Sequence, residues 1–148
     1  MGGYSGGEIA SNLATITARD YILDNFAPCD SDELNKEEIL KLIKKAMEEA
    51  NQAVWQKAKG NENLEKMGTT LEICLIYNDR AYIGHIGDSR IYRIRNNMIR
   101  KITTDHSYVQ ELVKDGTITK EQASYHPRKN MLMKAIRIWN VYRTRCDG

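Results

Sequence analysis

Two stretches near the start of the chain have the apolar spacing of helices. From about residue 6 to residue 25, apolar residues recur every three or four positions, which predicts an amphipathic helix. Ser5-Gly6-Gly7-Glu8 opens this stretch with the S-x-x-E form of a capping box. A second predicted helix begins after Asn35 and is capped by Asn35 and Glu38. Its apolar stripe comprises Ile39, Leu42, Ile43, Ala46, Met47, Ala50, Ala53 and Val54.

Beyond Gly68 the apolar period becomes that of strands. Strands are predicted at residues 70–77, 80–86, 90–95 and 98–102. Asn78-Asp79 and Asn96-Asn97 are typical two-residue hairpin turns between them. Two helices followed by four consecutive antiparallel strands predict an α+β fold, in which the helices pack on one face of a sheet.

Strand alternation also predicts which residues form the core. We expect the inward-facing strand residues to share one buried layer with the apolar stripe of the second helix. These strand residues are Leu71, Ile73, Leu75, Ile83 and Ile91, and their helix partners are Ile39, Ile43 and Met47. Cys74 lies in the same apolar run and is expected to be a small buried thiol.

The segment after the strands predicts short helices. Ser107–Lys114 has the pattern of a short helix that ends at Gly116, a residue suited to a helix C-terminus. Thr119 opens a further helical turn, because it repeats the capping-box pattern. His126-Pro127 ends that turn, since the residue before a proline avoids the α-helical region.

The composition is ordinary for one globular domain. The chain has 148 residues, of which 41% are hydrophobic and 28% are charged. A net charge of +2 is too small to predict binding to nucleic acid or to an anionic membrane. The apolar runs are far shorter than the roughly 18 residues that a membrane-spanning helix needs. No signal-peptide pattern opens the chain.

The cysteines and histidines do not form a metal-binding pattern. Cys29, Cys74 and Cys146 are widely spaced and include no C-x-x-C pair, which argues against a zinc site or a redox dithiol. The histidines lack the H-x-x-x-H spacing of a helical zinc site. An odd number of scattered thiols predicts a reducing, cytoplasmic compartment.

The most informative motif is the run Gly84-His85-Ile86-Gly87-Asp88-Ser89-Arg90. A strand that ends in this way places a carboxylate, a hydroxyl and a guanidinium on one tight turn, which can hold a divalent cation. Met67-Gly68-Thr69-Thr70 precedes the run and Thr104-Asp105-His106-Ser107 follows it. With Gly116 and His126-Pro127 downstream, the order and spacing of these motifs resemble the PPM-type (type 2C) metal-dependent protein serine/threonine phosphatases in their bacterial form.

The resemblance covers residues 1–135, as a partial PPM-type phosphatase domain whose flap lies at about residues 104–130. Residues 136–148 form a divergent tail. The family fold is a layered α/β/β/α sandwich. The resemblance implies that this chain holds only part of it, namely two helices, four antiparallel strands and the small helical flap.

The resemblance also implies a reaction. Phosphoserine and phosphothreonine would be hydrolysed by a water molecule that Mn²⁺ or Mg²⁺ activates. The expected partners are phosphoprotein substrates and serine/threonine kinases, with no nucleic acid and no membrane. In the family, an Asp-Gly that bridges the metal pair lies just before the position of Met1, so no catalytic residue is assigned within this chain.

Five residues of the chain receive a role from the resemblance or from their place beside its motifs. Asp88 would contact a metal at a third site beside the pair; the alternative is that it accepts backbone N–H bonds in its turn. Tyr4 stands where many relatives carry a histidine near the leaving-group oxygen, and a phenol is a poorer proton donor at neutral pH. His126, at the end of the flap, is a candidate for substrate contact. Arg90 is expected to brace Asp88 or a loop carbonyl, and His106 to fix the loop that opens the flap.

Two functional interpretations stay open at this point. The first is a cytoplasmic phosphatase, represented by a chain that is incomplete at both ends and inactive alone. The second is a non-catalytic binding or regulatory module that keeps the sheet and the flap without the metal centre. An unrelated α+β interaction domain fits less well, because the motifs occur in the family's order. Aspartate-bearing segments on either side of the chain would distinguish the first interpretation from the second.

Overall fold

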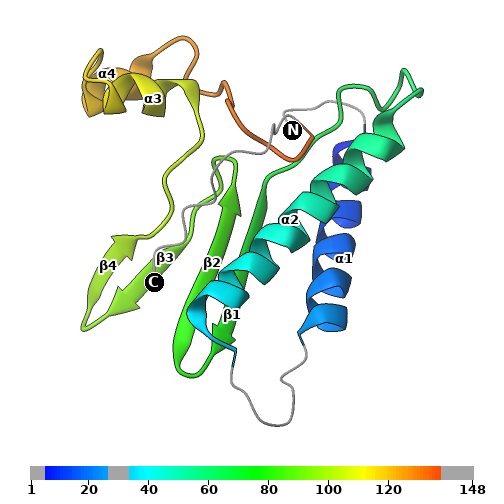
Figure 1. Ribbon diagram of the computed structural model, residues 1–148. Coiled ribbons are helices and arrows are strands. Elements are labelled where there is room, and N and C mark those ends of the chain that lie inside the picture. Colours follow the sequence, from blue (N-terminus) through cyan, green and yellow to red (C-terminus); the bar gives the residue numbers. More distant parts are fainter. Residues whose placement is uncertain (1–5, 27–33, 138–148) are drawn as a thin grey trace.

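The computed structural model describes residues 6–26 and 34–137. Within these ranges, two long helices, two hairpins and two short helices follow one another (Figure 1). In chain order they are α1 (Gly7–Asn25), α2 (Lys36–Ala58), β1 (Leu71–Tyr77), β2 (Arg80–Ile86), β3 (Tyr92–Arg95), β4 (Met98–Lys101), α3 (Tyr108–Lys114) and α4 (Lys120–Tyr125). The predicted α+β order of elements is confirmed. No helix in the described part of the chain has the length and apolar character that a membrane span requires.

The two long helices begin in different ways. α2 has the predicted capping box, because the Asn35 side chain accepts from the backbone N–H of Glu37 and Glu38 while the Glu38 carboxylate accepts from the N–H of Asn35. The N-cap of α1 is Gly6, at φ 87° and without a side-chain cap. The capping box predicted for α1 rests on Ser5, which lies outside the described residues, so it stays a prediction.

Both hairpins turn through residues with left-handed backbone angles. Asn78 and Asp79 have φ of 48° and 59°, and Asn96 and Asn97 have φ of 50° and 59°. Such pairs form the two-residue turns that match the twist of antiparallel strands. In the described ranges the hairpins are separate two-stranded sheets, whereas a single sheet was predicted. The chain leaves the first sheet at Gly87, whose backbone N–H and C=O bind a histidine downstream instead of a neighbouring strand.

The register of β1 and β2 decides which strand residues face the helices. Ile73 pairs with Gly84, and Cys74 pairs with Ile83. Because side chains alternate along a strand, these two pairs lie on opposite faces of the hairpin. The pair Ile73–Gly84 faces the helices, whereas Cys74 is exposed on the other face and Ile83 lies there with it. The predictions that Ile83 faces the core and that Cys74 is buried are therefore wrong.

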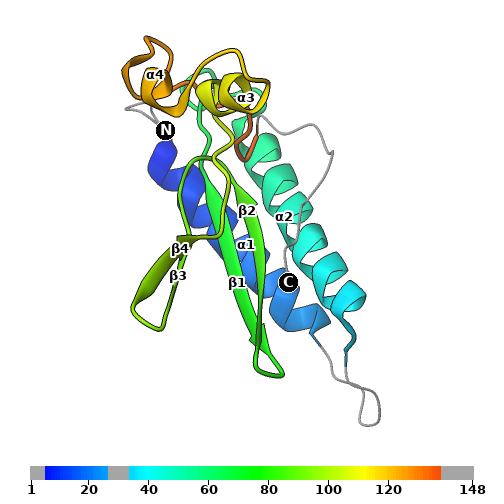
Figure 2. The ribbon, with the colours of Figure 1, turned by 90° about the vertical axis from the view of Figure 1, so that its left-hand side faces the viewer.

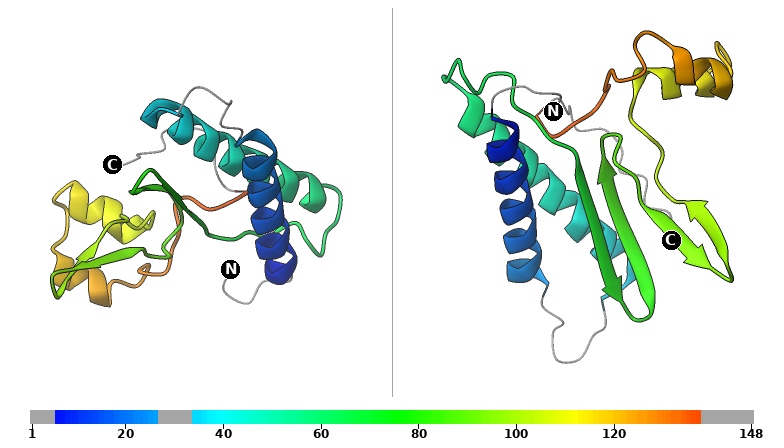
Figure 3. Two further views of the ribbon diagram at one scale, coloured as in Figure 1. Left: turned by 90° about the horizontal axis from the view of Figure 1, so that it is seen from below. Right: turned by 180° about the vertical axis from the view of Figure 1, so that it is seen from behind.

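Gly84 allows α2 to lie close to the sheet. A Cβ atom at this position would lie 2.5 Å from Cγ2 of Ile43 and 2.8 Å from Sδ of Met47. Ile43 and Met47 are fully buried, as predicted, and so is Ile39. Leu71, Ile73 and Leu75 also pack in this core as predicted, while Ile91 is not among the residues that contact it. Figures 2 and 3 show α1 and α2 together on one side of the β1–β2 hairpin.

The last described residues return to this core. Ile136 is fully buried, and its N–H donates to the carbonyl of Thr69 at 2.9 Å. The N–H of Arg137 donates to Oδ1 of Asn51 on α2 at 2.6 Å. The predicted tail at 136–148 thus begins with residues that contact α2 and the segment just before β1. Residues 138–148 lie outside the described ranges, so the boundary at residue 135 stays a prediction.

Candidate functional site

The tight turn after β2 is built around Gly87. Gly87 has φ of 116°, and a Cβ atom there would overlap Cγ2 of Thr70 and lie 2.7 Å from its Cβ. Only glycine adopts this angle and leaves this space. Across the turn, the hydroxyl groups of Thr70 and Ser89 are 2.8 Å apart and hydrogen-bonded. Asp88, the residue before Ser89, is exposed, and none of the described residues forms a hydrogen bond with its side chain.

Arg90 binds Asp105, at the base of the flap, in a fork. Nε lies 3.1 and 3.0 Å from the two carboxylate oxygens, and a terminal nitrogen lies 2.6 Å from Oδ2. Lys101 donates to the same carboxylate at 3.0 Å. Burial alone would raise the pKa of Asp105, but the hydrogen bonds from Arg90 and Lys101 outweigh it and hold the pKa below its ordinary value. The expected bracing of Asp88 or a loop carbonyl by Arg90 is corrected: its partner is Asp105.

A second link between the turn and the flap runs through His106. Its N–H donates to the carbonyl of Gly87 at 2.8 Å, and its Nδ1 accepts from the N–H of Gly87 at 3.2 Å. Its ring stacks on His85, with 4.8 Å between the centroids. Burial, followed by the charges of His85 and Lys134, lowers the pKa of His106 to about 4. The ring is therefore neutral at neutral pH and able to accept, which agrees with its expected role of fixing the loop.

The flap consists of the helices α3 and α4, and the chain segments that enter and leave it are hydrogen-bonded to each other. Ser107 caps α3 by accepting from the N–H of Gln110, and Thr119 caps α4 with the predicted capping box. The returning chain runs antiparallel to the base, since Tyr108 N–H donates to the Met131 carbonyl and Met133 N–H donates to the His106 carbonyl, both at 2.8 Å. Figure 3 shows α3 and α4 at the end of the molecule away from α1 and α2.

A pocket of about 350 Å³ lies between the flap and the turn. The turn contributes Asp88 and Arg90 to its wall, and the flap contributes Lys120 and Lys129. Lys129 donates to a carbonyl of the flap at 3.3 Å, while no described residue pairs with Lys120. The pocket therefore combines the Arg90–Asp105 ion pair with two lysines and with the Asp88 carboxylate, which no described residue pairs. This combination suits a metal-bound phosphate.

The carboxylate of Asp88 fits one part of a metal site. Carboxylate oxygens are the ligands that Mn²⁺ and Mg²⁺ prefer, and Asp88 is exposed to the pocket. Among the described residues, however, no three His, Cys, Asp or Glu side chains cluster closely enough to hold an ion. Asp105 also lines the pocket, but its carboxylate is held by Arg90 and Lys101. Among the described residues, Asp88 is therefore the pocket carboxylate that is not ion-paired, and no three potential ligands cluster there.

Among the described residues, the candidate His126 is not part of the pocket wall. His126 ends α4, where its Nδ1 accepts from the N–H of Arg128 at 3.1 Å, and its ring lies 5.9 Å from that of Tyr108. Tyr4 lies outside the described residues. Sequence reasoning missed the pairing of Arg90 with Asp105. Arg90 ends the Gly84–Arg90 motif and Asp105 lies in the Thr104–Ser107 motif. Their opposite charges were a signal from which an ion pair between the two motifs could have been predicted.

The family follows from comparison with known proteins. The family model described as Protein phosphatase 2C matches residues 1–141. The fold and the motifs therefore define a class of phosphatase-like domains, and this chain belongs to the protein phosphatase 2C family. The predicted resemblance is confirmed.

Among curated relatives, the serine/threonine phosphatase stp of Listeria welshimeri is 38% identical over 136 residues, which cover 92% of this chain and 52% of the relative. Serine/threonine protein phosphatase PstP of Mycobacterium tuberculosis is 37% identical over the same share of this chain and 25% of its own length. The chain thus spans about half of the Listeria relative, and less of the other.

Solved structures agree with this assignment. The crystal structure of Mycobacterium tuberculosis PstP superposes with a TM-score of 0.79 at 35% identity, covering 97% of this chain and 57% of that one. The structure of Stp1 from Staphylococcus aureus superposes with a TM-score of 0.78 at 31% identity. The match covers 99% of this chain and 55% of Stp1. A third structure is the catalytic domain of PstP in complex with two manganese ions, which superposes with a TM-score of 0.74 at 33% identity. The match covers 97% of this chain and 56% of that one. The partial PPM-type fold is thereby confirmed.

Proposed function

We propose that the protein to which this chain belongs hydrolyses phosphoserine and phosphothreonine in phosphoproteins, as a metal-dependent serine/threonine phosphatase. The observation that carries the proposal is the pocket between the Gly87–Arg90 turn and the flap, where the Asp88 carboxylate, unpaired among the described residues, meets Lys120 and Lys129. The names of the relatives support it, because each is a serine/threonine phosphatase.

In this proposal Asp88 supplies one carboxylate to a bound Mn²⁺ or Mg²⁺ at the pocket. Manganese is favoured, since PstP was solved with two manganese ions. When bound, such ions lower the pKa of a water molecule and offset the charge of the phosphoryl group. Tyr4, near the leaving group, and His126, at the edge of the flap, are the further residues that we propose lie near the substrate.

The other residues of the pocket bind and orient the substrate. The fork between Arg90 and Asp105 holds the turn against the base of the flap, so that Asp88 keeps its place at the pocket. Lys120, on the flap, has no anionic partner among the described residues and is positioned to attract a phosphate into the pocket. The flap therefore binds the phosphorylated segment on the side opposite the turn.

The partners and the compartment are proposed on the same basis. A phosphatase of this kind acts on proteins that serine/threonine kinases have phosphorylated, so such kinases are its expected partners. The exposed, unpaired thiol of Cys74 supports a reducing cytoplasm, where thiols persist without oxidation.

The test measures hydrolysis of p-nitrophenyl phosphate and of a phosphothreonine peptide in millimolar Mn²⁺. Two proteins are compared: this chain, and a chimera in which it replaces the matched segment of the Listeria relative. The chimera should turn over both substrates only with metal. The chain alone should not, because its described residues hold no cluster of three potential metal ligands, and Asp88 is the pocket carboxylate among them that is not ion-paired. A chimera that folds, by circular dichroism, and yet has no metal-dependent turnover would refute the proposed function.

A matched pair of variants tests the role of Asp88. In the chimera, Asp88→Asn should lower turnover and raise the Mn²⁺ concentration needed for half-maximal activity. Asp24→Asn is the control, because Asp24 is also exposed but lies on α1, outside the pocket. An equal response of the two variants to Mn²⁺ would remove Asp88 from the metal site.

A further inference from the structure

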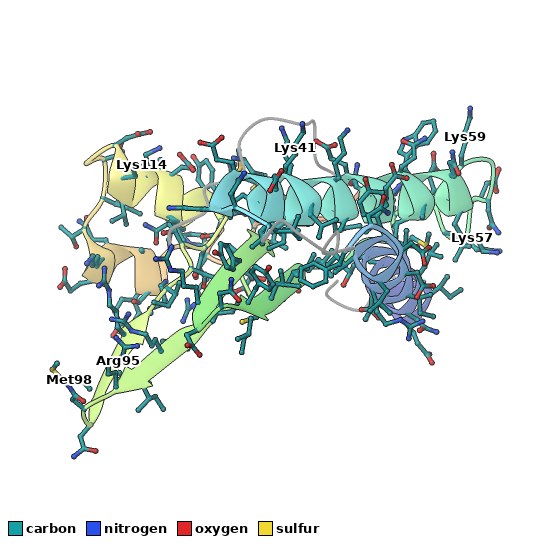
Figure 4. All side chains as sticks on the ribbon, turned by 60° about the horizontal axis from the view of Figure 1, so that its bottom comes forward. Lys41, Lys57, Lys59, Arg95, Met98 and Lys114 are labelled. Atoms are coloured by element: carbon teal, nitrogen blue, oxygen red, sulfur yellow. The ribbon has the colours of Figure 1, made fainter. Side chains whose placement is uncertain are left out.

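The β3–β4 hairpin carries three arginines on one of its faces. Its cross-strand pairs are Tyr92–Lys101, Arg93–Arg100, Ile94–Ile99 and Arg95–Met98. Because side chains alternate, Arg93, Arg95 and Arg100 share one face with Met98, and we call it the arginine face. The opposite face carries Tyr92, Ile94, Ile99 and Lys101. Figure 4 shows Arg95 and Met98 at the far end of the hairpin, away from α1 and α2.

The three cations of the arginine face have no anionic partner within residues 6–26 and 34–137. All three side chains are exposed, and none forms an ion pair with a described residue. Arg93 and Arg100 are direct cross-strand neighbours, so their Cβ atoms lie about 4.5–5.5 Å apart, where like charges destabilise a hairpin. By contrast, Arg90, just before the hairpin, is neutralised by Asp105. A bound anion would relieve the repulsion on the arginine face.

The residue type indicates which anion. The cations of α2 are all lysines, which is typical of a solvated helix surface, whereas this face uses only arginine. Guanidinium groups bind phosphate through two parallel hydrogen bonds, and clusters of them recognise phosphorylated segments. Carboxylates bind such a cluster as well, but a phosphate carries more charge and more acceptor oxygens.

The face also lies within reach of the pocket. Arg93 follows Asp88 by five residues, and an extended chain of that length spans at most about 18 Å. An extended peptide of six or more residues is therefore long enough to span from the pocket to Arg93.

We propose that the arginine face binds a second phosphorylated residue of the substrate, so that segments phosphorylated at more than one serine or threonine are preferred. This proposal rests on the proposed function for the identity of the substrate. The binding step itself needs no hydrolysis, and it is therefore tested separately from the chemistry.

The experiment measures fluorescence anisotropy of labelled peptides with the 148-residue chain. The peptides share one sequence and carry two phosphothreonines, one phosphothreonine, glutamate at both positions, or no phosphate. Oligothymidylate and vesicles containing phosphatidylserine serve as probes from other classes. The variant Arg93→Gln/Arg95→Gln/Arg100→Gln is compared with Lys36→Gln/Lys41→Gln/Lys57→Gln, which removes the same charge from exposed lysines of α2. A third variant replaces the three arginines with lysine.

We expect the doubly phosphorylated peptide to bind about tenfold more tightly than the singly phosphorylated or glutamate peptide. This advantage should disappear in the glutamine variant, shrink in the arginine-to-lysine variant, and persist in the α2 control. If circular dichroism shows that the glutamine variant does not fold, the test rests on the arginine-to-lysine variant, in which the preference for two phosphates should be smaller than in the wild type. Absence of peptide binding, equal loss in the α2 control, or equally tight arginine-dependent binding of oligothymidylate or vesicles would overturn the proposal.

The outcome is independent of the activity test. If the chimera hydrolyses phosphopeptides and the chain does not prefer two phosphates, the arginine face alone is rejected. If the preference is observed and the chimera is inactive, the proposed function alone is rejected.

Discussion

Adding one methyl group at Gly84 should destabilise the protein, although alanine is ordinarily the better residue within a strand. In an unrestricted strand, replacing glycine with alanine is favourable by about 0.5–1 kcal/mol, because glycine loses more backbone entropy on folding. At Gly84 the new Cβ atom would lie 2.5 Å from Cγ2 of Ile43 and 2.8 Å from Sδ of Met47. Both of those side chains are fully buried, so neither has open space to move into.

The expected magnitude follows from these opposing effects. Extra atoms in a packed core cost about 1–3 kcal/mol. After the entropic gain is subtracted, Gly84→Ala should lower the free energy of unfolding by about 1–2 kcal/mol. Ile43→Leu removes the methyl group that the new Cβ meets. In that background Gly84→Ala should therefore cost less, with a coupling of about 1 kcal/mol between the two sites.

Urea denaturation followed by far-UV circular dichroism measures these differences. The midpoint should fall in Gly84→Ala with an unchanged slope, since the amount of surface exposed on unfolding is the same. Cys74→Ala is the control, because Cys74 is exposed on the opposite face of β1 and its change should stay within about 0.5 kcal/mol. A midpoint of Gly84→Ala equal to or above that of the wild type would show that this face of the hairpin does not pack against α2.

Three further predictions concern the Arg90–Asp105 fork, the buried ring of His106 and the turn of the second hairpin. Asp105→Asn should lower the free energy of unfolding by about 1–3 kcal/mol, because it removes the charged partner of Arg90; a urea midpoint equal to wild type would contradict this. The pKa of His106 is lowered from 6.5 to about 4, so the unfolded chain takes up its proton first, and stability should fall as the pH drops from 6.5 toward 4. His106→Gln should flatten that part of the pH profile, and an unchanged profile would assign the effect elsewhere. Asn97→Val should lower the melting temperature more than Asn97→Gly, since φ is 59° there and a β-branched residue is strained; equal melting temperatures would argue against this turn.

The sequence alone determined the elements whose causes are local. The cap at Asn35 depends on a residue three positions away, and the turn at Asn96-Asn97 depends on two adjacent residues that tolerate left-handed angles. The flap helices begin at Ser107 and Thr119 for the same reason. Motifs of fixed order and spacing were also sufficient to recognise the family, because they do not depend on how the strands align.

Only the tertiary structure decided what depends on register and on distant contacts. Hydrophobicity favours Ile83 for the core, yet the two-residue turn sets a register that turns Gly84 inward and leaves Cys74 outside. The partner of Arg90 is a carboxylate on the far side of the second hairpin, and no local pattern connects the two. The burial of a side chain and the partner of a charged group depend on segments that are distant in the sequence and come into contact only in the folded protein. They therefore cannot be predicted from a single strand or motif.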